Sequence, residues 1–338
     1  MAALTVDKEG LQEALARARG WDRTPGNWSA TQITDGAAII EQGLRDFYFP
    51  PPLPGEKESH VWSFLRPLRT ITVWPEVTGT VSGSPVYATV STVTATAAKF
   101  YASMVGKTFT FDTSGTEYTI AGYTSSTVIT LTGDASGEAA DDTFTIESDG
   151  DFRLPDDFAD VLGPMLFSAG DYKYHAVEQT AMQTILQMRN SHGTSWSAEP
   201  KWFATQAEDY VEGTGQRYYL ALDAIPNSTY VLNYRSAVEP DMVSAESYVR
   251  GGTPHVQTVI EAILAAAENM LGDEFGVHEA KFRERLAASV SFDRQAHAAD
   301  TLGRNRDYST VGSGYSIEDE RVRRSDSGTM NVFDLFYL

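Results

Sequence analysis

Near the N-terminus, apolar side chains recur at three- and four-residue steps, and this spacing predicts two helices. The first spans residues 7–19 and stops at Gly20. The second begins near Ser29, whose spacing from Gln32 is that of a capping box. It ends before Pro50 because proline cannot donate to the helical hydrogen-bond ladder.

A second helical pattern lies toward the C-terminal third. Residues 253–271 carry a continuous apolar stripe that begins at Thr253, a candidate cap, and closes at Gly272. Residues 275–297 repeat the pattern, and Glu279 and Arg283 have the four-residue spacing of an exposed ion pair. We expect these helices to pack with the N-terminal pair as a bundle.

Between these regions the sequence predicts one more helix and a small sheet. Residues 172–189 have helical periodicity. Residues 200–204, 217–222 and 229–235 are expected to form a three-stranded antiparallel element. In its second strand, the alternation of side chains puts one group on one face, Tyr218, Leu220 and Leu222, and the other group on the opposite face, Tyr219 and Ala221.

Residues 76–150 have a different composition from the rest of the chain. They contain 17 Thr and 9 Ser but only two basic residues, Lys99 and Lys107. Short alternating runs in this segment are typical of half-buried strands. We expect strands at residues 86–94, 107–112, 117–123, 127–132 and 143–147, and a helical turn within residues 99–105.

The predicted fold class is therefore α+β. Residues 1–75 and 151–300 are expected to form a discontinuous core, a helical bundle with a small antiparallel sheet. Residues 76–150 are expected to form an inserted all-β domain, a sandwich or barrel. Residues 301–338 are expected to form an extended C-terminal arm.

The predicted arm ends in an apolar segment on a polar tether. Residues 301–338 contain five basic and six acidic residues and few core-forming side chains. Either the apolar end docks on its own domain, or it reaches a neighbouring subunit or partner and orders on binding. The candidate docking residues are Val332, Phe333, Leu335, Phe336, Tyr337 and Leu338.

Composition narrows the function further. The 338 residues include no cysteine, which excludes disulfides, thiol nucleophiles and cysteine-bound zinc. The formal net charge is −20, which argues against tight binding of DNA or RNA. No segment has the sequence of a signal peptide or of a membrane span. We therefore expect that the protein does not associate with a membrane.

The usual catalytic motifs are missing from the sequence. The six histidines never have the spacing of a helical zinc pair, and neither a phosphate-binding loop nor a nucleophilic serine elbow occurs. Carboxylates leave one enzymatic option, a hydrolase that uses Asp156 and Asp157 or Asp149 and Asp151. A calcium loop is a second option, with the oxygen ligands Asp134, Glu138, Asp141 and Asp142. These residues lack the ordered spacing of an EF-hand, which favours a solvated hairpin tip instead.

Five segments resemble the head-to-tail connector, or adaptor, proteins of tailed bacteriophages, the group that includes tail tubular protein A and related gateway proteins. The segments are residues 43–51 (Gly-Leu-Arg-Asp-Phe-Tyr-Phe-Pro-Pro), 60–65 (His-Val-Trp-Ser-Phe-Leu), 152–158 (Phe-Arg-Leu-Pro-Asp-Asp-Phe), 230–235 (Tyr-Val-Leu-Asn-Tyr-Arg) and the final helical pair. The match is one of pattern and order over residues 25–295. In that family the second segment runs almost directly into the third, so residues 76–150 look like an insertion.

This resemblance implies a structural virion protein without enzymatic activity or cofactor. It implies a homo-oligomeric ring, a dodecamer, bound below the portal protein at the head-tail interface after assembly in the host cytoplasm. The ring would extend the DNA channel for genome ejection and provide the platform for a tail or nozzle protein. The arm would dock on the portal, and double-stranded DNA would pass through the lumen without specific contacts.

Two alternatives stay open at this stage. A tail-associated or surface protein could recognise a glycan through its β domain, with Tyr87, Tyr118 and Tyr123 as aromatic platforms, although core packing also explains these tyrosines. The carboxylate hydrolase is the other alternative.

Overall fold

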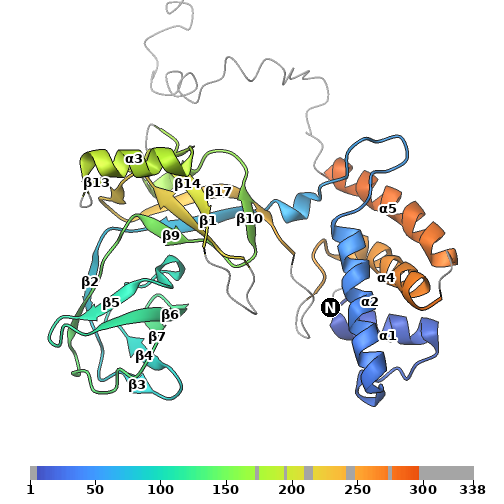
Figure 1. Ribbon diagram of the computed structural model, residues 1–338, viewed down its shortest axis with the longest axis horizontal. Coiled ribbons are helices and arrows are strands. Elements are labelled where there is room, and N and C mark those ends of the chain that lie inside the picture. The colour runs from blue at the N-terminus through green and yellow to red at the C-terminus, as the bar shows by residue number, and fades with distance from the viewer. Residues whose placement is uncertain are drawn as a thin grey trace, which may run out of the picture. The chain divides into compact units, whose positions relative to one another are not determined.

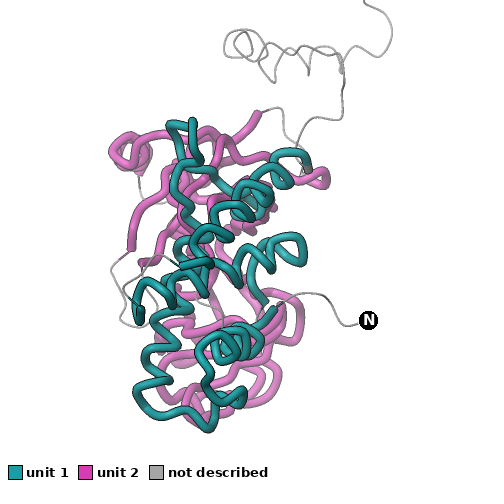
Figure 2. The backbone as a smooth tube through the Cα atoms, turned by 90° about the vertical axis from the view of Figure 1, so that its right-hand side faces the viewer, with its two compact units in different colours: residues 1–67, 238–304 teal, residues 68–237, 305–338 magenta. Residues whose placement is uncertain are grey.

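The computed structural model describes residues 6–171, 175–193, 196–208, 216–240, 248–272 and 276–296. Within these residues the protein is a mixed α+β structure with five α-helices and several antiparallel sheets, one of them a curled sheet of seven strands (Figure 1). The chain divides into two compact units (Figure 2). We call residues 1–67 and 238–304 the helical unit and residues 68–237 the sheet unit. The predicted arm, with its docking residues Val332 to Leu338, lies outside the described residues.

The described residues of the helical unit form four α-helices and three short 3₁₀ turns. The helices are α1 (Lys8–Arg19), α2 (Ala30–Tyr48), α4 (Val256–Gly272) and α5 (Val277–Ala296). The turns are η1 (Pro25–Asn27), η2 (Ser63–Leu65) and η5 (Thr253–His255).

The caps of α1 and α2 follow the sequence. The Asp7 side chain accepts a hydrogen bond from Gly10 N (2.9 Å), and Gly20 ends α1 in the left-handed conformation. The Ser29–Gln32 capping box is present at the start of α2, as predicted. The exposed pair of Glu279 and Arg283 is also present, at 2.8 Å.

Helix α4 is the centre of the helical unit, because it packs against α1, α2 and α5. The close approach to α2 depends on Gly43, where an added Cβ would lie 2.5 Å from Ile263 Cα. Beside this contact, Trp62 is fully buried and donates from Nε1 to Phe47 O (2.8 Å). A glycine on α2 thus lets the two helices approach, and aromatic side chains fill space nearby.

The predicted cap at Thr253 is wrong. Gly252, with φ +71°, is the cap residue of η5, and Thr253 is itself the first residue of that turn. The chain therefore enters α4 through a 3₁₀ turn, because successive glycines at 251 and 252 both adopt positive φ.

Besides the curled sheet, the described residues of the sheet unit form two four-stranded sheets and one α-helix. The first sheet joins β1 (Leu68–Val73), β17 (Tyr230–Val238), β10 (Phe158–Val161) and β11 (Leu166–Phe167). The second joins β12 (Glu178–Gln179), β14 (Trp202–Ala207), β15 (Tyr218–Leu222) and β9 (Asp151–Arg153). A two-stranded pair, β13 (Ser197–Ala198) with β16 (Ile225–Pro226), the helix α3 (Met182–His192) and the turn η4 (Ala169–Asp171) complete this part.

Residues 151–237 therefore contain more sheet than the sequence predicted. The expected helix at residues 172–189 begins only at Met182. Before it, Val177 exchanges backbone hydrogen bonds with Met165, and Glu178–Gln179 pairs with β14. The apolar spacing near residue 177 is that of a buried strand rather than of a helix.

The predicted three-stranded element is also wrong in its last member. β14 and β15 pair antiparallel as expected, with Phe203 opposite Leu222. β17 instead pairs with β1, with Tyr230 opposite Val73. The link at residues 223–229 takes the chain from the sheet of β14 and β15 to the sheet of β1, and within this link Ile225–Pro226 pairs with β13. The predicted faces of β15 agree with the packing, since Leu220 belongs to the main core and Ala221 to a small cluster under α3.

The curled sheet is built from residues 77–146 alone. Its order is β2 (Val77–Thr80), β8 (Thr143–Ile146), β5 (Thr108–Phe111), β6 (Glu117–Ser125), β7 (Val128–Leu131), β4 (Ser91–Thr94) and β3 (Val86–Tyr87), with every pair antiparallel. It curls until Val81, just after β2, forms a bridge with Ala95, just after β4. Phe100, Phe109, Phe111 and Phe144 fill the interior.

Two details of this sheet differ from the prediction. Residues 86–94 form a hairpin rather than one strand, because the chain reverses where Ala88 N donates to Val90 O. Both side chains of β3 are exposed. The alternating sequence pattern predicted a half-buried strand here, and that prediction is wrong for β3. Strand β2 was not predicted. The helical turn is present as η3 (Ala102–Met104).

The interior of the curled sheet is continuous with the interior of the two four-stranded sheets. One cluster of buried residues extends from Ile71 and Trp74, through Phe109 and Phe144, to Phe152 and Tyr234. The domain borders at residues 76 and 150 stay a prediction, and residues 77–146 share one compact unit with the strands on either side of them.

Candidate functional site

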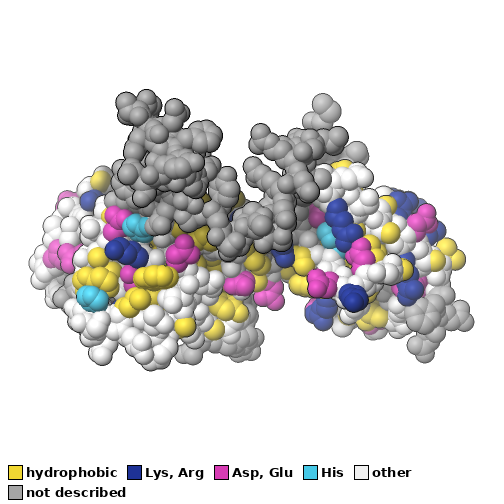
Figure 3. Space-filling view, turned by 90° about the horizontal axis from the view of Figure 1, so that it is seen from above, with side chains coloured by type: hydrophobic (Ala, Val, Ile, Leu, Met, Phe, Trp, Pro, Cys, Tyr) yellow, Lys and Arg dark blue, Asp and Glu magenta, His cyan; other side chains and the backbone are white. Residues whose placement is uncertain are grey.

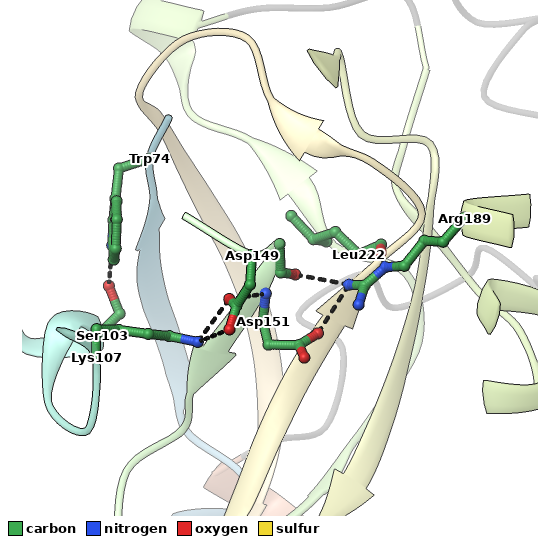
Figure 4. Close-up of polar contacts among 8 residues, drawn as sticks. Trp74, Ser103, Lys107, Asp149, Asp151, Arg189 and Leu222 are labelled. Atoms are coloured by element: carbon green, nitrogen blue, oxygen red, sulfur yellow. Dashed lines mark hydrogen bonds and ion pairs between the residues drawn. The ribbon is translucent and has the colours of Figure 1, made fainter. Parts of the chain in front are cut away.

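The chain crosses twice between the curled sheet and the rest of the sheet unit, at residues 74–76 and 147–150. At the first crossing the buried Trp74 donates from Nε1 to Ser103 Oγ (3.2 Å) (Figure 4). Ser103 Oγ in turn donates to Thr72 O (2.6 Å). The Trp74 ring meets the edge of Phe152 at a centroid distance of 5.5 Å. The turn η3 is thereby fixed to β1 and β9 across the crossing.

Ion pairs fix the second crossing on both sides. Figure 4 shows Asp149 and Asp151 between Lys107 and Arg189. Lys107 Nζ lies 2.6 Å from both carboxylate oxygens of Asp149. Arg189, on α3, donates to Leu222 O (2.8 Å), Gly150 O (3.1 Å) and Asp151 Oδ1 (2.7 Å). Both cations are therefore engaged by the crossing, and one arginine joins α3, β15 and β9.

A cavity of about 800 Å³ lies beside these ion pairs, and we call it the junction cavity. Its lining comes from both crossings, from α3 and the residues after it, and from the link after β15. Its charged lining residues are Glu76, Glu147, Asp149, Asp223 and Arg189. The lining thus contains four carboxylates and one guanidinium. That guanidinium, of Arg189, already binds Asp151 and two backbone carbonyls.

Asp223 is the most buried of these carboxylates, with 3% of its surface exposed. Its Oδ1 accepts from Lys201 N (3.1 Å) and Trp202 N (3.3 Å), at the start of β14. Its Oδ2 accepts no hydrogen bond from the described residues. Trp196 also lines the cavity, and its ring stacks on His192 at 4.0 Å. The sequence did not indicate Arg189, Trp196 or Asp223 as functional residues. They belong to different segments, and only the position of α3 and the pairing of the strands bring them to one cavity.

The structure separates the predicted catalytic carboxylates into individual ion pairs. Asp157 forms a bidentate pair with Arg69, both distances 2.6 Å, and this pairing raises the pKa of Arg69. Asp156 lies 2.6 Å from Arg153 and 3.3 Å from Arg217. Asp156, both its arginines and Tyr123 line a second cavity, of about 650 Å³. Asp149 and Asp151 bind Lys107 and Arg189, as described above.

The four oxygen residues of the predicted calcium loop each have a different hydrogen-bond donor. Asp134 accepts from Ser136, Asp141 from Gly83 N, Asp142 from Thr113 and Glu138 from the Tyr118 hydroxyl. Desolvation, together with the bond to Glu138, raises the pKa of Tyr118 to about 12. In the part of the chain that the structure describes, no group of three or more His, Cys, Asp or Glu residues is placed to hold a metal ion.

The three tyrosines proposed for glycan binding differ in exposure. Tyr87 and Tyr123 are 45% and 39% exposed, whereas Tyr118 packs edge-on against Phe111. Within the described residues, five of the six histidines have polar or aromatic partners. His255 lies among the rings of Phe47, Trp62, Phe64 and Phe292. His60 contacts Asp293 (2.9 Å), His278 contacts Glu261 (2.7 Å), His175 contacts Glu199 (3.3 Å), and His192 stacks on Trp196. His297 lies outside the described residues.

Comparison with models of protein families found no match for this chain. Comparison with curated proteins found no match either. No helix among the described residues is long and apolar enough to cross a membrane.

Proposed function

We propose that this protein is a structural subunit of a tailed-bacteriophage head-to-tail connector, which assembles as a ring of copies below the portal. In this proposal the helical unit belongs to the connector core, residues 76–150 are an inserted domain, and residues 301–338 form the arm that docks on the portal. The order of the family-like segments supports this function, together with the surface of the helical unit.

The single observation that carries the proposal is the set of large apolar side chains that the helical unit leaves exposed. Phe49 and Val277 are 62% and 65% exposed. Met270 and Leu271, at the end of α4, lie close in sequence to Val277, and Val61 follows Phe49 across one loop. On the face seen in Figure 3, hydrophobic side chains lie among charged ones. We infer that these exposed apolar side chains belong to a surface that a neighbouring copy in the ring covers.

Charge supports the same proposal. The helical unit contains 20 acidic and 13 basic residues, and the sheet unit contains 20 acidic and 9 basic residues, so their net charges are −7 and −11. A ring of about twelve chains has a formal charge on the order of −240, which repels the phosphate backbone within a Debye length of about 10 Å. Either unit would give a lumen wall to which DNA does not adhere.

The ion pairs at Asp149, Asp151, Asp156 and Asp157 favour a structural role over hydrolysis. Catalytic carboxylates must face each other across the bond that they cleave, whereas here each carboxylate is bound to an arginine or lysine. The glycan-binding alternative retains one supporting observation, the exposure of Tyr87 and Tyr123.

Light scattering of the purified chain, alone and mixed with the portal protein of the same virion, tests the proposal. We expect a ring-sized particle, seen end-on by negative-stain electron microscopy, and a complex with the portal. Deletion of residues 332–338 should weaken portal binding and keep the ring. The double variant Tyr87→Ala/Tyr123→Ala is the matched control and should keep both. A chain that stays monomeric and does not bind the portal would contradict the connector proposal. So would binding of a glycan by the parent that the tyrosine variant loses.

A further inference from the structure

We propose that the free edge of strand β1 binds an extended segment of a partner protein, and that an acidic side chain of this segment pairs with two arginines beside the edge. The occupant is thus an acidic peptide in the β conformation. The inference rests on the sheet unit alone and does not depend on the connector function.

Strand β1 is the first strand of its sheet and pairs only with β17 among the described strands. In an antiparallel pair, the backbone groups of every second residue point away from the partner strand. The carbonyl of Thr72 points away from β17, because it accepts from Ser103 Oγ of η3 (2.6 Å). Val231, opposite Thr72, likewise uses its carbonyl on the other side of β17, where it accepts from Ser168 N (2.8 Å). The N–H and C=O of Thr70, two positions before Thr72, therefore also point to the free edge, and no other described residue binds them.

The sequence of β1 does not protect this edge. Edge strands that stay free in native proteins usually carry a lysine, a proline or a bulge. The segment Leu68–Val73 has neither lysine nor proline, and its register with β17 is continuous. Its one charged residue, Arg69, is bound by Asp157. Leu68, at the start of the strand, is 71% exposed, so an added strand would also cover an apolar side chain.

A cavity of about 650 Å³ lies along this edge, and we call it the arginine cavity. Its lining includes residues 70–72 of β1, part of η3 and residues 121–123 of β6. This part of β6 is free on one side, because the last backbone hydrogen bonds on the β5 side, among the described residues, are those of Ile120. The arginine cavity thus lies beside two strand edges, and both offer backbone groups to an extended peptide.

The charge of the arginine cavity selects an acidic partner. Its charged lining residues are Arg153, Arg217 and Asp156, which give a net charge of +1 in a unit whose net charge is −11. One oxygen of Asp156 serves both arginines, at 2.6 Å from Arg153 and 3.3 Å from Arg217. The two guanidinium groups therefore share one carboxylate, and a second carboxylate would balance their charge.

Arg217 supplies an independent observation. Its Nε lies 3.3 Å from the Asp156 oxygen but is not aligned for a hydrogen bond, and it is buried without a hydrogen-bond partner among the residues that the structure describes. Burial of a donor that has no acceptor is costly. A carboxylate in the arginine cavity would give Arg217 this acceptor, since the planar guanidinium binds a carboxylate through two parallel N–H groups.

Titration of the full chain with a synthetic peptide tests the inference. The probe is acetyl-Thr-Val-Thr-Glu-Thr-Val-Thr-amide, whose residue types favour strands, and the matched control peptide has Gln in place of Glu. In NMR spectra of the backbone amides we expect saturable shifts at Thr70 and its neighbours in β1. The Gln peptide should bind about tenfold more weakly, because it lacks the carboxylate that the arginines bind.

N-methylation of the probe tests the strand pairing without any change to the protein. The N–H groups of every second residue in an added strand point toward β1. Methylation at successive peptide positions should therefore alternate between loss of binding and little effect. A peptide that is held by its charge alone would show no alternation.

The variant Arg217→Gln tests the charge pairing. It should reduce the preference for the Glu peptide over the Gln peptide from about tenfold to about twofold. Lys201→Gln removes the same charge from an exposed residue of the same unit outside the arginine cavity, and it should keep the preference.

Four results would each overturn the inference. They are the absence of saturable binding, shifts confined to residues away from β1 and the arginine cavity, equal binding of the Glu and Gln peptides, and methylation effects without alternation. All four are measured on the parent chain, so they decide the question even if Arg217→Gln folds poorly.

Discussion

At the scale of single residues, local rules predicted the helix caps because each cap needs only its own sequence neighbours. Ser29 with Gln32 and Gly20 are examples. The junction cavity was beyond such rules. Arg189 lies 38 positions after Asp151 and 33 before Leu222, and only the strand pairing reveals that one guanidinium binds both.

Gly150 offers a test of the contact with Arg189. Its φ of +81° favours glycine, and an added Cβ would lie 3.1 Å from Arg189 Nη2 and 3.4 Å from Ala224 O. We expect Gly150→Ala to lower the free energy of unfolding by about 2–4 kcal/mol, from the positive φ and from disturbed hydrogen bonds. Gly115 has a φ of +68° and open space around it, so Gly115→Ala should cost only about 1–2 kcal/mol. Equal losses in urea unfolding would show that the Arg189 contact contributes little.

His255 should make stability depend on pH. It is 3% exposed, and its Nδ1 has no hydrogen-bond partner among the residues that the structure describes. The rings of Phe47, Trp62, Phe64 and Phe292 surround it. Burial lowers its pKa, against an opposing effect of Asp293 and with a further lowering by His60.

The sign of this effect follows from linkage. Above the ordinary histidine pKa of about 6.5, neither state binds a proton at His255, so stability is unaffected. Below it the unfolded chain binds the proton first, and stability falls. Unfolding midpoints measured from pH 7 to pH 5 should therefore fall less in His255→Phe than in the parent, while the slopes from pH 8 to pH 9 should agree. The pKa of Asp293 is lowered, so its contribution to the free energy of unfolding is lost only below about pH 4. Asp293 therefore does not account for a change between pH 7 and pH 5. Parallel slopes from pH 7 to pH 5 would exclude His255 as the cause.

At the scale of elements, periodicity identified α1, α2, α4 and α5 but failed where a short strand is followed by a helix with no glycine or proline between them. Ala176 and Val177 are buried by strand pairing, and α3 starts five residues later. Partner choice was also beyond the sequence. The pattern of β17 fits either sheet, and the pairing of Ile225–Pro226 with β13 decides which one it joins.

Gly43 tests the packing of α2 on α4. In an exposed helix, glycine to alanine stabilises by about 1 kcal/mol. At Gly43 the new Cβ would lie 2.5 Å from Ile263 Cα, which is backbone and cannot rotate away. We expect the clash to exceed the helical gain, so that Gly43→Ala lowers the unfolding free energy by about 1–3 kcal/mol. Gly26, in η1, would have no atom within 4 Å of an added Cβ and serves as control, with an expected change below about 1 kcal/mol. A stabilised Gly43→Ala protein would mean that α2 and α4 are further apart.

At the scale of the whole molecule, composition alone identified residues 76–150 as distinct, and the structure confirms that they are rich in strands. The sequence could not reveal that their core continues into the rest of the sheet unit. That continuity depends on Trp74, which lies at a crossing, packs against Phe152 and bonds to Ser103 of η3. These three residues are far apart in the sequence and carry no shared motif.

Removal of the curled sheet tests whether it is an independent insertion. If residues 77–146 are replaced by a short Gly-Ser linker, Trp74 and Phe152 lose their cover from η3 and the curled sheet. Exposure of two such side chains costs on the order of 5 kcal/mol, which is comparable with the stability of an ordinary domain. We therefore expect amide hydrogen exchange in β15 and β17 to accelerate strongly, while α2 and α4, in the other compact unit, stay protected and serve as the internal reference. The variant Val86→Thr/Tyr87→Thr changes only exposed side chains of β3 and should leave protection unchanged. Native protection of β15 and β17 after the deletion would instead establish residues 77–146 as a separable domain, whose core contributes nothing to its neighbours.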